Sequence, residues 1–146
     1  MRDQFWIKFP LTELDKEEWE ALCDGCGRCC LHKLEDIDSG DVHFTNVACQ
    51  LLDTSSCQCR DYPNRKQKVP DCLVLDATSI LNNTALPVTC AYRLLAEGKS
   101  LPGWHPLISG KTDTVLEAGI TMQGRCVSEV DVAVEELEHH LIELNE

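Results

Sequence analysis

The stretch Cys23-Asp-Gly-Cys26-Gly-Arg-Cys29-Cys30 decides how this chain is expected to fold. Cysteine recurs in it at every third position. A Cys-x-x-Cys turn lets two thiolates reach one ion from a tight bend, and zinc–sulfur bonds measure about 2.3 Å. The glycines between the cysteines allow positive φ and keep side chains out of the way. The spacing therefore predicts a loop that offers three metal ligands, Cys23, Cys26 and Cys29.

Cys30 follows Cys29 directly, and adjacent side chains point in different directions, oppositely if the chain is extended. Both thiolates are therefore hard to place on one ion that Cys23 and Cys26 also bind. The motif is expected to serve more than one ion, or to supply a thiolate that bridges two. Its first three cysteines match the start of the bacterial ferredoxin run, but no Cys-Pro pair follows three residues later.

Eight of the ten cysteines lie within residues 23–72. Cys57 and Cys59 would share one face of an extended segment and so aim at one centre, and Cys49 and Cys72 flank them. The segment is rich in turn signals, so its regular elements are expected to be short and its own apolar surface small. Metal crosslinks would then replace the missing core.

Structural disulfides are the other explanation for so many cysteines, and the start of the chain argues against them. The first ten residues, MRDQFWIKFP, contain no apolar signal region and no cleavage site. Cytosolic thiols stay reduced, and no apolar run approaches the roughly 20 residues of a membrane span. We therefore expect a soluble cytoplasmic protein with reduced cysteines.

The net charge limits the partners. Thirteen basic and 25 acidic residues give −12, and a field of this sign opposes the approach of phosphate backbones. The one basic stretch, residues 65–68, is short and is interpreted as a solvated loop. The expected partners are metal ions, with a protein partner left open and with neither nucleic acid nor a membrane.

Several stretches resemble the YcgN-like branch of the YkgJ-type cysteine-cluster family, the CxxCxxCC group of small bacterial zinc- or iron-chelating proteins. They are LCDGCGRCCLHKL at 22–34, FTNVACQ at 44–50, CQCRDY at 57–62, PDC at 70–72, TCAYRLLAEG at 89–98 and LPGWHPL at 101–107. The resemblance implies nine metal-binding cysteines, namely Cys23, Cys26, Cys29, Cys30, Cys49, Cys57, Cys59, Cys72 and Cys90. Cys126 lies outside the pattern and is interpreted as a small buried hydrophobe. The resemblance implies no reaction.

Nine thiolates leave the nuclearity open. Two four-cysteine sites use eight, a trinuclear zinc cluster with bridging sulfurs uses nine, and one or two iron–sulfur clusters use four or eight. The predicted function is a metal-binding protein that holds zinc or iron through a multi-cysteine cluster, in an unknown physiological role. The alternative is an iron–sulfur redox protein or a component of an iron–sulfur enzyme. No catalytic residue is assigned, because all-cysteine sites lack an open coordination position and an adjacent base.

The histidines are weaker candidates. His32, two residues after Cys30, is the best placed to be a ligand or to hydrogen-bond one. His105 is expected to be exposed or to serve in packing, and His139 and His140 to be solvated.

The predicted fold is a small single domain spanning 1–146, α-rich or α+β, with a turn-rich cysteine cluster between terminal helices. Helices are expected at 11–22, with Thr12 as the cap, at 88–97 and at 128–144, the last an amphipathic C-terminal helix. Short strands are expected within 113–127. The metal-binding region is 23–90, and its centre is expected between the N-terminal helix and the 88–97 helix.

Overall fold

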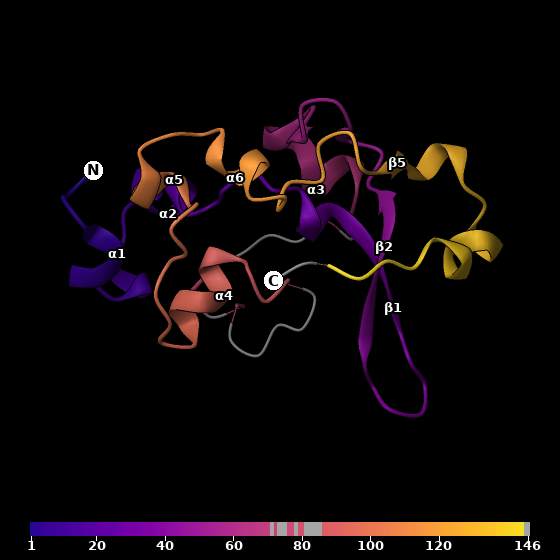
Figure 1. The fold of residues 1–146 in the computed structure, drawn as a ribbon, viewed down its shortest axis with the longest axis horizontal. Helices are drawn as coiled ribbons and strands as arrows, with labels where there is room; N and C mark the ends of the chain where they lie inside the picture. The colour runs from indigo at the N-terminus through magenta and orange to yellow at the C-terminus, as the bar shows by residue number, and fades with distance from the viewer. Residues whose placement is uncertain (71, 73–75, 78, 81–85, 145–146) are drawn as a thin grey trace. The chain divides into compact units, whose positions relative to one another are not determined.

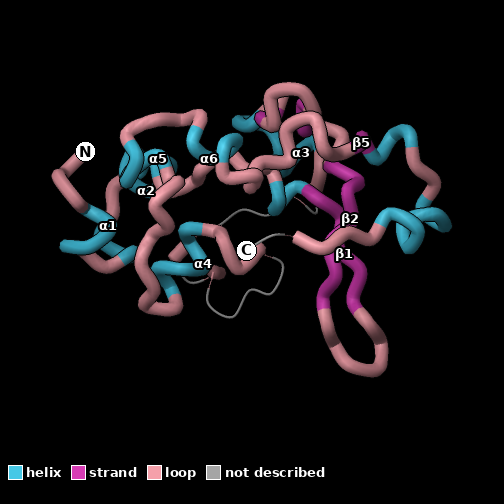
Figure 2. The backbone as a smooth tube through the Cα atoms, viewed as in Figure 1, coloured by secondary structure: helices cyan, strands magenta, loops and turns pink. Residues whose placement is uncertain are grey.

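The computed structural model describes residues 1–70, 72, 76–77, 79–80 and 86–144. The chain divides into two compact units, each built from two segments. The helical unit comprises Met1–Asp24 and Leu75–Gly119, and the cysteine unit comprises Gly25–Val74 and Ile120–Glu146. Short helices, short strands and long connections alternate in both (Figures 1 and 2). The fold is mixed α+β rather than α-rich, and a single domain over 1–146 stays a prediction.

The helical unit is built from short helices. They are α1 (Phe5–Lys8), η1 (Leu11–Glu13), α2 (Lys16–Ala21), α4 (Ala91–Ala96), α5 (Pro106–Ser109) and α6 (Thr114–Glu117), where η denotes a 3₁₀ segment.

A capping box starts α2. The Asp15 side chain accepts the Glu18 N–H at 2.8 Å, and the Glu18 carboxylate accepts the Asp15 N–H at 3.1 Å. Asp15 is extended in this cap, and this divides the helix predicted for 11–22 into η1 and α2. The helix therefore begins after Asp15, and the cap predicted at Thr12 is wrong.

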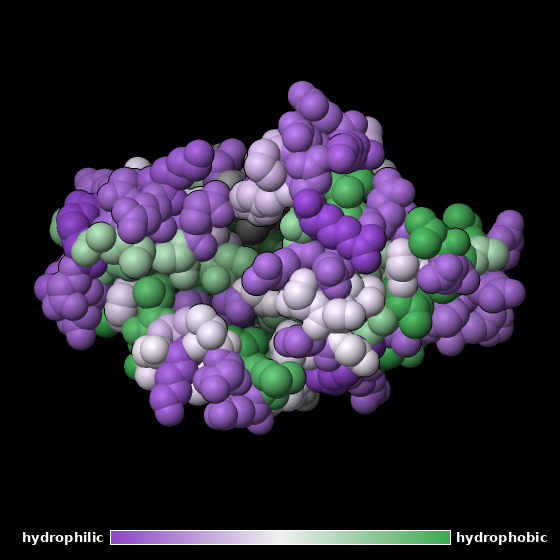
Figure 3. Space-filling view, turned by 90° about the horizontal axis from the view of Figure 1, so that it is seen from above, coloured by the Kyte–Doolittle hydropathy of each residue, from purple (hydrophilic) through white to green (hydrophobic). Residues whose placement is uncertain are grey.

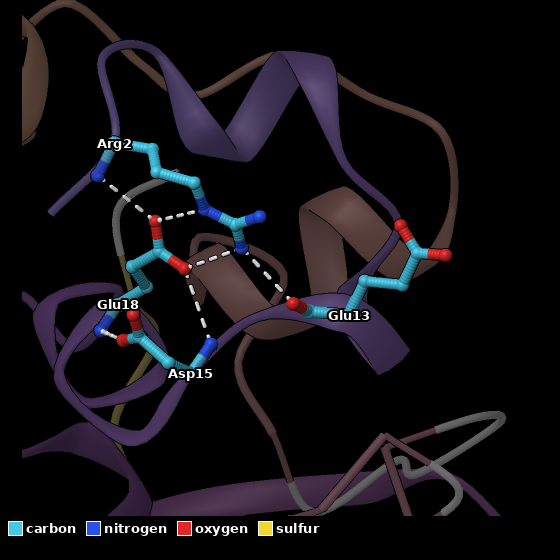
Figure 4. Close-up of polar contacts among 4 residues, drawn as sticks. All are labelled: Arg2, Glu13, Asp15 and Glu18. Atoms are coloured by element: carbon cyan, nitrogen blue, oxygen red, sulfur yellow. Dashed lines mark hydrogen bonds and ion pairs between the residues drawn. The ribbon is translucent and has the colours of Figure 1, made fainter.

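The Glu18 side chain is fully buried and is paired with Arg2 (Figure 4). Arg2 donates from Nη2 to Oε1 at 2.7 Å, and from Nε and its backbone N–H to Oε2 at 3.1 Å each. The side-chain hydrogen bonds from Arg2 lower the pKa of Glu18 to about 2, although burial acts in the opposite direction. The pair therefore ties the start of the chain to α2 through an ionised carboxylate.

The helix predicted for 88–97 is confirmed as the shorter α4, which Cys90 precedes as the N-cap residue. Gly98 lies just past its end at φ 75°, as expected for a glycine that ends a helix. Tyr92 from α4 donates its hydroxyl to the Trp19 carbonyl at 2.7 Å, and the two rings lie 4.8 Å apart. This contact packs α4 against α2.

His105 is fully buried in the helical unit. The Leu107 N–H donates to its Nδ1 at 3.0 Å, so Nε2 carries the proton that it donates to the Leu22 carbonyl at 2.8 Å. His105 is thus a packing residue, one of the two roles expected for it. Its bond to Leu22 holds the backbone immediately before Cys23.

The cysteine unit contains two small sheets and several short turns. Its elements are η2 (Arg28–Cys30), β1 (Leu31–Glu35), β2 (Val42–Ala48), β3 (Leu52–Asp53), β4 (Gln58–Cys59), η3 (Tyr62–Asn64), α3 (Arg65–Lys68), β5 (Val127–Ser128), η4 (Glu129–Asp131) and η5 (Val134–His140). One sheet has the order β1-β2-β5, and the other pairs β3 with β4.

A hairpin of β1 and β2 follows the cysteine motif directly (Figure 1). Asp36 starts its turn by accepting the N–H groups of Asp38 and Ser39, and Gly40 supplies φ 76°. The expectation of little regular structure in 23–72 missed this hairpin. Its strands carry few turn residues, and β2, Val42-His-Phe-Thr-Asn-Val-Ala, is rich in β-branched and aromatic residues.

The cysteine unit also has an apolar core, which the sequence pattern did not predict. Leu31, Ala48, Leu52, Cys57 and Met122 are buried together. Met122 comes from the second segment, and its N–H donates to the Cys26 carbonyl at 2.8 Å. The C-terminal segment therefore packs in the same unit as most of the cysteines.

The continuous helix predicted for 128–144 is also wrong. Ser128 does cap a turn, accepting the Val130 N–H, but the turn is η4, and the seven-residue η5 follows it. Beyond η5 the chain runs along β2, where the Ile142 N–H donates to the Phe44 carbonyl at 2.9 Å and Leu141 pairs with Thr45. Valines recur in 127–134 and weaken the helix, while β2 offers backbone partners instead. The strands expected in 113–127 reduce to β5, and α6 precedes it.

Hydrophilic side chains cover much of the face seen in Figure 3, with hydrophobic patches between them. No helix among the described residues has the length and apolar character needed to cross a membrane.

Candidate metal centre

Seven of the nine predicted ligands belong to the cysteine unit: Cys26, Cys29, Cys30, Cys49, Cys57, Cys59 and Cys72. The other two, Cys23 and Cys90, belong to the helical unit, at the end of the first segment and before α4. All ten cysteines are free thiols. A centre between the N-terminal helix and the 88–97 helix therefore stays a prediction.

The loop that leads into η2 depends on its glycines. Gly25 and Gly27 take φ 73° and 78°, as the sequence predicts. Gly27 also meets a close neighbour, since a Cβ built on it would lie 2.2 Å from Cys57 Sγ. Only glycine therefore lets the Cys57 thiol approach this loop.

Cys29 and Cys30 lie on one 3₁₀ turn, and their side chains are hydrogen-bonded to each other. This bond, followed by burial and by the charges of Cys29, Cys49 and Cys72, raises the pKa of Cys30. The two adjacent thiols thus lie together rather than pointing apart, because η2 is not extended. The arrangement is compatible with the bridging alternative.

Five cysteines influence one another electrostatically and form what we call the thiol cluster: Cys29, Cys30, Cys49, Cys59 and Cys72. The Cys49 N–H donates to the Cys30 carbonyl at 2.8 Å, which joins the start of β1 to the end of β2. Burial raises the pKa of Cys49 and of Cys72, and neighbouring thiolates add to the effect. A raised pKa favours the neutral thiol over the thiolate at Cys30, Cys49 and Cys72.

Cys57 lies in the apolar core of the unit, directly before β4. Its φ of 62° is left-handed, and a shared centre for Cys57 and Cys59 stays a prediction. Its buried Sγ donates to the Cys26 carbonyl at 3.2 Å. Cys126 packs against the same core, and burial, followed by the charge of Cys57, raises its pKa. Cys126 is thus partly buried, as expected, but not remote from the other cysteines.

Two cations belong to the segment that carries the cysteine motif, Arg28 and Lys33. Arg28 is fully buried and donates from Nε to the Ile120 carbonyl at 2.8 Å. Lys33 donates to the Cys29 carbonyl at 2.6 Å and lies 5.3 Å from the centre of the Phe44 ring. Burial lowers the pKa of Lys33, whereas the charges of Cys29 and its neighbouring cysteines act to raise it. Lys33 would therefore offset part of the negative charge that thiolates bring.

His32 and Glu129 form a further polar pair at the edge of the thiol cluster. His32 Nε2 lies 3.5 Å from Glu129 Oε2, which also accepts the Gln50 N–H at 2.7 Å. Sequence reasoning singled out His32 but missed Glu129, Arg28 and Lys33. Arg28 and Lys33 stand next to the cysteine motif and could have been noticed there, whereas nothing local marks Glu129.

Comparisons with known proteins show the family to which the chain belongs. A family model described as "Putative zinc- or iron-chelating domain", CxxCxxCC, matches residues 22–91. UPF0260 proteins match nearly the whole chain. One from Rhodopseudomonas palustris is 52% identical over 139 residues, covering 94% of this chain and 82% of the relative. The chain belongs to the UPF0260 family.

Two further UPF0260 proteins give the same result. One from Pseudomonas fluorescens is 51% identical over 140 residues, covering 96% of this chain and 94% of the relative. One from Gluconacetobacter diazotrophicus is 55% identical over 137 residues, covering 94% and 84%. No solved structure matches the chain. The CxxCxxCC match spans all nine predicted ligands, while Cys126 and Glu129 lie beyond it.

The donor set of this UPF0260 protein fits a soft or borderline metal, because thiolates suit zinc and iron. Within the described ranges, no three cysteine, histidine, aspartate or glutamate side chains are already arranged to hold an ion. The thiols are neighbours without converging on one point. A metal would therefore draw them together as it binds, which couples its binding to the folding of the unit.

Proposed function

We propose that this protein holds zinc or iron in the cytoplasm through its nine cysteines: Cys23, Cys26, Cys29, Cys30, Cys49, Cys57, Cys59, Cys72 and Cys90. The observation that carries the proposal is the thiol cluster, which gathers cysteines from separate segments: the Cys49 N–H donates to the Cys30 carbonyl, and the Cys30, Cys49 and Cys72 thiols lie close enough to act on one another electrostatically. Reduced thiols gain little from gathering in this way. They gain much when a cation replaces their protons.

The proposed role is metal binding without catalysis, with zinc as the favoured ion. An all-cysteine zinc site is closed and lacks the open position that a catalytic zinc keeps. Such a site would fasten the short elements of the cysteine unit to one another. The proposal includes no catalytic residue.

An iron–sulfur centre is the second candidate, and the cation Lys33 favours it. Lys33 donates to the Cys29 carbonyl, and the charges of Cys29, Cys30 and Cys26 act on its ammonium group. Positive charge near a cluster stabilises its reduced, more negative form and so raises its reduction potential. A redox role would give this cation a function that a purely structural zinc site does not require.

Anaerobic purification of the full chain, followed by metal analysis and a visible spectrum, distinguishes these candidates. A colourless protein with stoichiometric zinc supports the first. A brown protein that contains iron and acid-labile sulfide, and that bleaches on reduction, supports the second. A protein that carries neither metal, and binds neither after reduction and reconstitution, contradicts both.

A further inference from the structure

The register of the main sheet brings residues from three distant parts of the chain into one row. Leu31 pairs with Ala48 across the antiparallel strands, and Ala48 pairs with Ser128 across the parallel strands. One residue further on, the Cys49 N–H donates to the Cys30 carbonyl. Glu129 follows Ser128 and therefore lies beside Cys49, at the end of the sheet where the thiol cluster begins.

Contacts of Glu129 agree with this placement. Its Oε2 accepts the Gln50 N–H at 2.7 Å and lies 3.5 Å from His32 Nε2. Its charge also contributes, after burial, to the raised pKa of Cys49. The Glu129 side chain is about one-third exposed, and the hydrogen bond from the Gln50 N–H holds its carboxylate in place. One side chain thus contacts both cysteine-bearing strand ends.

His32 occupies an irregular position on β1. The pairing register with β2 shifts between Leu31 and Lys33, and the carbonyl of His32 accepts the Thr45 hydroxyl at 2.9 Å. Such irregularities re-aim side chains and are common next to functional sites. His32 lies two residues after Cys30 in the chain, and its ring Nε2 lies beside the Glu129 carboxylate.

A histidine that binds metal usually gives its other ring N–H to a carboxylate or a carbonyl, which fixes the tautomer and orients the ring. The Glu129 carboxylate, which the Gln50 N–H holds in place and which lies 3.5 Å from His32 Nε2, can take that role for His32. Because Nε2 of His32 faces Glu129, Nδ1 is the ring nitrogen that would bind an ion. A neutral imidazole would also add a donor without adding negative charge.

We propose that His32 is a nitrogen ligand at the edge of the cysteine centre, beside Cys30 and Cys49, and that Glu129 positions its ring. The site takes a divalent ion such as zinc, and one of its ions has mixed sulfur and nitrogen ligands. Glu129 is a positioning residue contributed by the C-terminal segment, outside the matched CxxCxxCC region. The inference rests on the proposed function.

The test uses the full chain loaded with Co²⁺ under anaerobic conditions, and a chelator competition measures affinity. We expect His32→Ala to shift the cobalt d–d bands and to weaken binding at least tenfold. We expect Glu129→Gln to weaken binding about 10- to 100-fold with the bands nearly unshifted, because the ligand atoms stay the same. His139 with Glu138 is a matched control, an exposed pair at 3.9 Å from the same unit, and His139→Ala should change neither quantity.

A second measurement needs no substitution at His32. In protein loaded with ¹¹³Cd²⁺, scalar coupling between the metal and the ring protons of His32 supports ligation, and its absence overturns it. Wild-type bands and affinity in His32→Ala also overturn it. Wild-type affinity in Glu129→Gln overturns the positioning role. A wild-type protein that binds no zinc, cobalt or cadmium contradicts the proposed function itself, so the two failures are distinguishable.

Discussion

At the scale of single residues, the centre depends on contacts that tolerate little change. Gly27 illustrates this, since its φ is positive and the Cys57 thiol occupies the space of a Cβ. Cys30 illustrates it through its hydrogen bond to Cys29 and its place among the other thiols of the cluster. The cysteine motif therefore depends on close packing at its glycine as well as on its cysteines.

Gly27→Ala should destabilise the protein by about 3 kcal/mol, combining the cost of a left-handed alanine with that of overpacking. Gly25→Ala is the matched control, because Gly25 has φ 73° and no atom within 4 Å of the place that an added methyl group would occupy. It should cost only about 1 kcal/mol. Urea unfolding of both variants measures the difference, and equal losses would contradict a tight fit at Cys57.

Cys30→Ser should remove at least one ion per chain, because a serine hydroxyl is too hard and too weak a donor to replace a thiolate. Cys126→Ser should leave the metal content unchanged and cost about 1 kcal/mol of packing. Cys23→Ser and Cys26→Ser should lose metal alike if the turn brings both to one ion. Metal analysis of the four variants is the measurement. Loss of metal in Cys126→Ser as severe as in Cys30→Ser would make Cys126 a ligand.

At the scale of elements, the secondary structure of a segment depends both on its local sequence and on its tertiary contacts. The capping box of Asp15 and Glu18 starts α2, and the same Glu18 carboxylate serves Arg2. Because the Glu18 carboxylate both caps the helix and binds Arg2, protonation of this one group should weaken α2. The C-terminal segment shows the opposite outcome, where pairing with β2 overrides an apolar pattern that favours a helix.

The Glu18 contact should make the helical unit lose stability in acid. Its pKa is lowered from 4.5 to about 2 by the Arg2 hydrogen bonds. The stabilisation is therefore complete above pH 4.5 and is lost as the pH falls toward 2. Thermal melts of wild type and Glu18→Gln should converge over that interval. Glu17→Gln, exposed on the same helix, is the control, and a Glu18→Gln curve parallel to wild type throughout would contradict the linkage.

At the scale of the whole molecule, metal should support the cysteine unit more than the helical unit. Seven of the nine proposed ligands lie in the cysteine unit, whose elements are short. The core of Leu31, Ala48, Leu52, Cys57 and Met122 should preserve part of the fold without metal. The apo protein is therefore expected to be loosened rather than fully unfolded.

Chelation under reducing conditions should lower Tm sharply, since an ion at 1,000 times its Kd stabilises the folded state by about 4 kcal/mol. Hydrogen exchange should rise mainly in β1, β2 and η2, and much less in α2 and α4. Calorimetry with hydrogen exchange measures both effects. An apo protein with the Tm and exchange pattern of the metal-loaded form would show that metal does not support the fold.

The sequence by itself determined the features that depend on neighbours within a few residues. The sequence alone predicted the cysteine spacing and the family relationship. It also predicted the positive φ of Gly25 and Gly27 and the glycine that ends α4. Each of these features follows from local backbone geometry or from a short sequence motif. Thr12 as a cap failed for a local reason too, because the reciprocal Asp15–Glu18 box is the stronger cap.

Only the tertiary structure decided which distant residues meet. The parallel pairing of β5 with β2 places Glu129 beside Cys49 and His32. A separate backbone hydrogen bond places Met122 beside Cys26. No periodicity within 120–144 reveals that pairing, because its partner strand lies some eighty residues earlier in the chain. The apolar residues of 128–144 fit a helix on their own. The backbone hydrogen bonds that replace the helix come from β2, which is distant in the sequence.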